Sequence, residues 1–289
     1  MPGKPAEAPR VNVYIDGYNF YVPLSTMEER RYELSWCDFL ALAGGLTKRL
    51  AAEHPTEFGT CRLGSVKYFT ATIPENMPKN RGGIERKYSW LDALHYHTGG
   101  RVEVIHGTFR PRKHRFYIER DELDNLARAG IPVDWKLLNT GTTTFRPTLR
   151  IHEEKQTDVM LACSLITDAA LGRAGCQPSL AIQAAPHHRS NPRPTPSACQ
   201  AAIVVSADID FLPCAEMAIS VFNCPVAVAF AFPHEGYELG EAEHGRHPQL
   251  FTIKASETEL RHSMLPLEVP LPDGRRICFD KIQRAHFNR

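Results

Sequence analysis

Short apolar, β-branched runs alternate with longer segments of helical periodicity along most of this 289-residue chain. Continuous apolar runs are typical of strands buried on both faces, and such strands connected by helices form parallel sheets. We therefore expect an α/β fold, with an open, mostly parallel central sheet and helices on both faces. The expected strands are 11–15, 63–70, 102–109 (with 115–118 as its hairpin partner), 202–206 and 225–232, and the expected helices are 36–52, 81–97, 154–171 and 211–221.

The same pattern suggests how the chain is divided. Residues 1–10 are polar and Pro-rich, which is typical of a flexible terminus. Residues 11–232 are expected to form one domain, interrupted by a Pro-rich insertion at 172–200. Residues 233–289 are expected to form a C-terminal extension with a strand at 250–253 and a short helix at 256–261.

Composition excludes several classes of protein. The hydrophobic content is 43% and the formal net charge is +1, which excludes a disordered or fibrous chain. No apolar run approaches the ~20 residues of a membrane helix, and the first residues resemble no secretory signal. We therefore expect a soluble, cytoplasmic protein without a membrane partner. The eight cysteines form no C-x-x-C pair, so we expect reduced thiols and no zinc finger, and the oligomeric state stays open.

Acidic residues follow two of the expected strands. Asp16 ends the first strand, Asp208 and Asp210 follow the strand at 202–206, and Asp158 opens the helix expected at 154–171. In an open parallel sheet, ligands bind outside the carboxyl ends of the strands. Carboxylates that converge there repel one another unless a cation is present, and Mg²⁺ or Mn²⁺ is the cation that prefers oxygen ligands. Each acid also has an ordinary structural interpretation as a turn, helix-cap or first-turn residue.

Three segments carry a resemblance to a known family. They are residues 13–21 (VYIDGYNFY), residues 154–162 (EKQTDVMLA) and residues 204–213 (VVSADIDFLP). Together and in this order they resemble the motifs of NYN domains, which belong to the PIN-like nuclease superfamily. The resemblance covers residues 11 to about 232.

The resemblance implies a PIN-like fold and a metal-dependent endoribonuclease that acts on single-stranded or structured RNA. It implies that Asp16, Asp158, Asp208 and Asp210 hold the metal, that Asn19 orients a ligand or phosphate, and that Ser206 supports the cluster. Many NYN domains carry a further acid where this chain has Ser164. Asp168, one turn further along the same helix, is the candidate substitute.

The segment 101–120 is the strongest candidate for RNA binding. It is rich in basic residues and interleaved with aromatic ones, and its candidate phosphate ligands are Arg110, Arg112, Lys113 and Arg115. The ordinary interpretation is a solvated basic surface.

Two other functions stay open. A catalytically weak RNA-binding or adaptor protein would retain the same acids as fold elements, and the serine at 164 is consistent with it. A phosphatase-like hydrolase is disfavoured, because the haloacid dehalogenase type needs a second acid where this chain has Tyr18.

Overall fold

The computed structural model describes residues 8–26, 32–72, 81–115, 118–128, 144–145, 148–174, 194–206, 208, 210–230 and 247–279. The chain divides into two compact units, one of Met1–Gly107 with Gln156–Arg289 and the other of Thr108–Lys155. No helix among the described residues is both long and apolar enough to cross a membrane.

The larger unit is built on a mostly parallel sheet, as the alternation of strands and helices predicts. Its strands are β1 (Arg10–Asp16), β2 (Arg62–Thr72), the first part of β3 (Val102–Arg115), β7 (Ala201–Val205), β8 (Val226–Phe230) and β9 (Leu250–Lys254). Their order is β3-β2-β1-β7-β8-β9, and β1 pairs in parallel with both β2 and β7. The β7–β8 and β8–β9 pairs are also parallel. The fold is therefore α/β, and β9 brings part of the C-terminal extension into the sheet.

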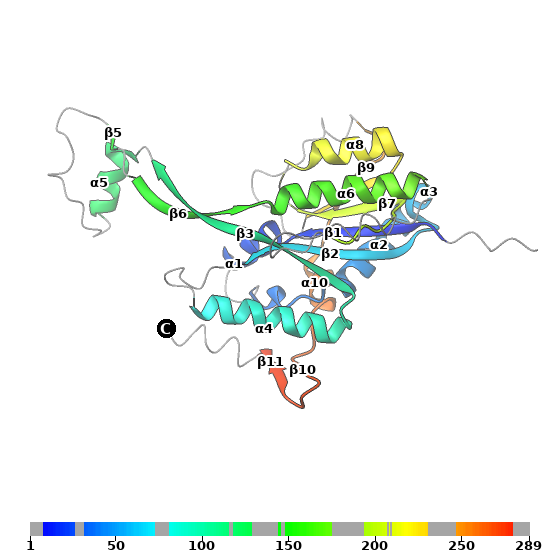
Figure 1. Cartoon of the computed structure of the whole chain (residues 1–289), viewed down its shortest axis with the longest axis horizontal. Coiled ribbons are helices and arrows are strands. Elements are labelled where there is room, and N and C mark those ends of the chain that lie inside the picture. Colours follow the sequence, from blue (N-terminus) through cyan, green and yellow to red (C-terminus); the bar gives the residue numbers. More distant parts are fainter. Residues whose placement is uncertain are drawn as a thin grey trace, which may run out of the picture. The chain divides into compact units, whose positions relative to one another are not determined.

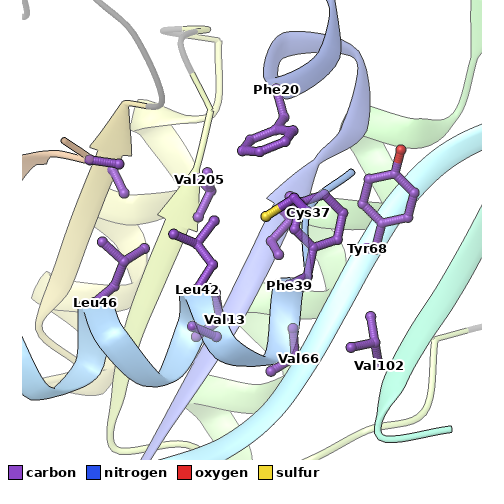
Figure 2. Packing of buried hydrophobic residues seen from close by; sticks show 14 of the residues in the cluster. Val13, Phe20, Cys37, Phe39, Leu42, Leu46, Val66, Tyr68, Val102 and Val205 are labelled. Carbon is purple, nitrogen blue, oxygen red and sulfur yellow. The ribbon is translucent and has the colours of Figure 1, made fainter. Parts of the chain in front are cut away.

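Helices cover both faces of this sheet (Figure 1). The helices α2 (Phe39–Glu53), α4 (Arg81–Thr98) and α10 (Glu257–His262) contribute to one hydrophobic cluster, and α6 (Thr157–Ala174) and α8 (Leu212–Phe222) contribute to the other. Alternate residues of β1 belong to opposite clusters, because successive side chains of a strand point to opposite faces. Val13 lies in the first cluster, where Figure 2 shows it beneath α2, and Tyr14 lies in the second.

The smaller unit contains the rest of β3, which pairs antiparallel with β6 (Thr148–Lys155). It also holds the two-stranded sheet of β4 (Ile118–Glu119) and β5 (Thr144–Phe145), and helix α5 (Arg120–Arg128). Two predictions were wrong here. The hairpin partner of β3 is β6 and not residues 115–118, and the helix expected from residue 154 begins at Thr157 because 154 and 155 complete β6.

The remaining described elements are short. They are α1 (Gly17–Thr26), the 3-10 helix η1 (Tyr32–Ser35), α3 (Pro55–Phe58), β10 (Glu268–Pro270) and β11 (Arg276–Cys278). Helix α6 continues to Ala174, into the segment expected to be an insertion. Most of that insertion, residues 175–193, lies outside the described residues, as do residues 1–7.

Candidate functional site

The candidate site lies where the chain connections of the sheet change direction. From β1 the strand order runs to β2 and β3 on one side and to β7, β8 and β9 on the other. Ligands of open α/β sheets bind at such a switch point, outside the carboxyl ends of the strands. Ile15 pairs with Val205, so Asp16 at the end of β1 lies beside Ser206, which directly follows β7.

Asp16 is held by four hydrogen bonds. Its Oδ1 accepts the backbone amides of Tyr18 (3.1 Å) and Asn19 (3.2 Å), which makes Asp16 the N-cap of α1. Its Oδ2 accepts the Asn19 side-chain Nδ2 at 2.6 Å and the Ser206 hydroxyl at 2.9 Å. Asp16 is only 5% exposed, and its carboxylate lies at the N-terminus of α1. Ser206, which is expected to support the cluster, thus donates to this carboxylate, and Asn19, which is expected to orient a ligand or phosphate, donates to it as well.

Two further hydrogen bonds connect Ser206 with Asp208 and Asp210, which follow β7. The Ser206 Oγ accepts the backbone amide of Asp208 at 3.0 Å, and the Asp208 Oδ1 accepts the backbone amide of Asp210 at 2.9 Å. Asp208 is half-buried and Asp210 is exposed. These two local contacts hold Asp208 and Asp210 directly after the carboxyl end of β7.

Asp158 approaches the same edge from α6. It is the second residue of that helix, and Asp16 and α6 lie on the same side of the sheet because positions 14 and 16 of β1 share a face. Partial loss of hydration raises the pKa of Asp158, and the negative charges of Asp16, Asp208 and Asp210 raise it further. The structure thus brings the four predicted acids within electrostatic reach of one another.

The chemistry of these donors fits Mg²⁺ or Mn²⁺, but they are not assembled around a common point. The two Asp16 oxygens already accept four hydrogen bonds, which matches the roughly four lone-pair sites of a carboxylate. Within the described ranges, no three His, Cys, Asp or Glu side chains form a group that could hold a metal ion. A cation would draw on the exposed carboxylates of Asp158 and Asp210 and on Asp208, after rotation of their side chains.

Asp168 does not belong to this edge. It lies ten residues after Asp158 on α6, about 15 Å along the helix axis, and it is fully buried. Its carboxylate is engaged elsewhere, so it does not substitute for the acid absent at position 164. Ser164 itself is buried and donates its hydroxyl to the Met160 carbonyl at 2.7 Å.

The partner of Asp168 is a residue that the sequence reasoning missed. Lys67 of β2 donates its Nζ to the Asp168 Oδ2 at 2.6 Å. The Tyr14 hydroxyl (2.8 Å) and the Asn12 amide (3.2 Å) reach the same oxygen, and the Ser197 amide reaches Oδ1 at 2.7 Å. Burial raises the pKa of Tyr14, and the neighbouring Cys199 and Asp168 raise it further. The available signal was a lysine between two large apolar or aromatic residues, Val66 and Tyr68, of the expected strand.

The basic residues predicted to bind RNA all lie on β3 in the smaller unit. Arg112 and Lys113 are exposed, and the side chains of Arg110 and Arg115 lie outside the described part of the chain. The register with β6 places Lys113 opposite Arg150, whereas Arg110 is opposite Glu153.

The chain matches no protein-family model. It is 29% identical over 175 residues to the 6-hydroxy-3-succinoylpyridine 3-monooxygenase HspA of Pseudomonas putida, a match that covers 58% of this chain and 50% of that protein. A crystal structure of a protein of unknown function from Vibrio parahaemolyticus matches 87% of this chain and 96% of its own, with 15% identity and a TM-score of 0.37. The chain thus spans about half the length of the curated relative.

Proposed function

We propose that this chain is a metal-dependent ribonuclease of the NYN type, which hydrolyses phosphodiester bonds at the carboxyl ends of β1 and β7. The observation that carries the proposal is the convergence of Asp16, Asp158, Asp208 and Asp210 at that edge. The pKa of Asp158 is raised first by its partial burial and then by the negative charges of Asp16, Asp208 and Asp210. A divalent cation would offset the repulsion among these carboxylates, and a cation at such a site can activate water for the hydrolysis of a phosphodiester.

In the proposed reaction, a water oxygen forms a bond to phosphorus, the bond from phosphorus to the leaving oxygen breaks, and the leaving oxygen takes a proton from solvent. Bound Mg²⁺ or Mn²⁺ supplies positive charge that offsets the charge developing on the phosphate oxygens. The hydrogen bonds from Asn19 and Ser206 hold the carboxylate of Asp16 in a constant position at the edge. Asp158 or Asp210 accepts the proton of the attacking water, since both are exposed to solvent.

The direct test is cleavage of an end-labelled single-stranded RNA with Mg²⁺, Mn²⁺ or EDTA. We expect cleavage only with metal, and a loss of roughly 100-fold or more in Asp16→Asn and Asp210→Asn. The matched control is Asp92→Asn, which removes an exposed carboxylate from α4 and should leave the rate unchanged. Intact RNA under every condition, with binding retained, would instead support the RNA-binding adaptor.

The comparison with HspA supplies a second candidate, oxygenation of a hydroxypyridine, and the observation in its favour is the 29% identity over 175 residues. Incubation with 6-hydroxy-3-succinoylpyridine, oxygen and a nicotinamide reductant tests it. A product whose mass shows oxygen incorporation, together with intact RNA, would replace the nuclease proposal.

A further inference from the structure

We infer that Tyr18, with Tyr21 one helical turn further on, forms a platform on which an unpaired base of the RNA stacks beside the acidic edge. This inference rests on the proposed function, because it names the form of the substrate. Tyr18 is 60% exposed and Tyr21 is 41% exposed. Residues three apart on a helix are surface neighbours, so the two rings share one side of α1.

The neighbouring residue Phe20 fixes which side of α1 faces outward. Phe20 is 3% exposed and packs edge-on against Phe39 of α2, with ring centroids 4.9 Å apart. Figure 2 shows this side chain directed toward the core. Position 18 is about 200° around the helix from position 20. Tyr18 therefore points away from the core, and its ring is not part of the packing that holds α1 in place.

The base of this platform is rigid. The Tyr18 amide donates to the Asp16 Oδ1 at 3.1 Å. Gly17 lies so close to the end of β2 that a Cβ there would be 2.6 Å from the Phe69 carbonyl oxygen and 2.6 Å from the Tyr68 hydroxyl. The first turn of α1 is thus fixed to the carboxylate of Asp16 and to β2. A rigid aromatic surface loses little conformational entropy when a base stacks on it.

The position of the platform favours a single strand as the ligand. The backbone amide of Tyr18 is bound to Asp16 at the edge of the sheet where we propose that the phosphodiester is cleaved, so a base on the Tyr18 ring would belong to a nucleotide near that bond. Stacking on a tyrosine requires a free base face, and bases in a duplex already cover both faces with their neighbours. The platform should therefore select unpaired RNA, with little preference for sequence because every base has a π face.

The test uses single-stranded RNA that contains 2-aminopurine, a base analogue whose fluorescence falls on stacking, and the full-length protein in EDTA. We expect quenching on binding to the wild-type protein and to Tyr18→Phe, because the ring and not the hydroxyl stacks. Tyr18→Ala should lose the quenching and bind the single strand about tenfold more weakly. Its affinity for a duplex of the same sequence should not change.

The matched control is Tyr96→Ala, which removes another exposed tyrosine, 44% exposed and located on α4. It should behave as the wild-type protein does. Equal quenching in Tyr18→Ala and wild type, or equal losses for duplex and single strand, would overturn the platform. Absence of cleavage with metal, while Tyr18-dependent quenching persists, would overturn the nuclease and leave the platform standing as an RNA-binding surface.

Discussion

Lys67 and Asp168 form an ion pair in the interior of the larger unit, although they lie 101 residues apart in the chain. The Nζ of Lys67 is 2.6 Å from the Asp168 Oδ2, and their side chains are 1% and 0% exposed. Breaking a buried pair from one side leaves an uncompensated charge and typically costs about 3–5 kcal/mol. We expect that cost for Lys67→Met, measured as a lower urea midpoint at an unchanged m-value.

The double variant Lys67→Met with Asp168→Leu distinguishes an ion pair from two independent side chains. We expect its loss of stability to be smaller than the sum of the two single losses, because no charge is left buried alone. Some loss should persist, since Tyr14 and the Ser197 amide would no longer have Asp168 as acceptor. Strictly additive losses would contradict a coupled pair.

The raised pKa of Asp158 predicts that its carboxylate lowers the stability of the fold while it serves the proposed metal site. The folded protein holds a proton on Asp158 more tightly than the unfolded chain does. The free energy of unfolding therefore falls as pH rises from the ordinary pKa of aspartate to the raised pKa of Asp158. Asp158→Asn should therefore be more stable than wild type at pH 7. The gain should stay below about 1 kcal/mol because Asp158 is exposed to water.

Thermal unfolding at two pH values checks this prediction. At about pH 3, where aspartate is protonated in both states, the stability difference should disappear. Addition of Mn²⁺ at pH 7 should raise the melting temperature of wild type more than that of the variant, because a ligand stabilises the state that binds it. If Asp158→Asn is less stable than wild type at pH 7, the carboxylate of Asp158 stabilises the fold, and the prediction is wrong.

Local patterns predicted the strands around the site. The segments 11–15 and 202–206 are mostly apolar because β1 and β7 are buried on both faces, and each strand is completed or followed by a polar residue of the edge, Asp16 or Ser206. Asp16, Asp208 and Asp210 could be assigned to that edge from the chain alone, because parallel strands bring their carboxyl ends together. Nothing in the chain predicted that Asp16 would use both oxygens in capping α1 and in binding Asn19 and Ser206.

The parts of the structure that were not predicted, β6 and the position of Asp168, have no recognisable pattern in the neighbouring sequence. Residues 148–155 (TLRIHEEK) form β6 but are too polar to resemble a buried strand, and their partner on β3 fixes their conformation. The helix was consequently expected to begin too early. Asp168 was the candidate substitute for the acid absent at position 164, and this prediction was wrong. Its partner Lys67 lies on β2, far away in the sequence, and meets Asp168 only through the tertiary fold.

Gly17 predicts that the acidic edge is sensitive to a single methyl group. An added Cβ would be 2.6 Å from the Phe69 carbonyl oxygen, so Gly17→Ala must displace the first turn of α1. We expect a loss of stability of about 1–3 kcal/mol, together with loss of cleavage because Asn19 moves away from Asp16. Gly45→Ala is the control. A Cβ at Gly45 meets nothing within 4 Å, so this change within α2 should raise stability by about 0.5–1 kcal/mol with activity unchanged.

The exposed basic residues of β3 predict how RNA binding depends on salt. If Arg112 and Lys113 contact phosphates, each releases counterions, and the slope of log K against log salt should fall by about 0.7 for each contact removed from a single strand. Arg112→Gln and Lys113→Gln should therefore weaken binding equally for all sequences and flatten that slope. Lys48→Gln, at an exposed position of α2, is the matched control and should leave the slope unchanged. Loss of a phosphate contact must change the number of counterions released. If the slope is the same in both β3 variants as in wild type, RNA therefore binds to other surfaces of the protein.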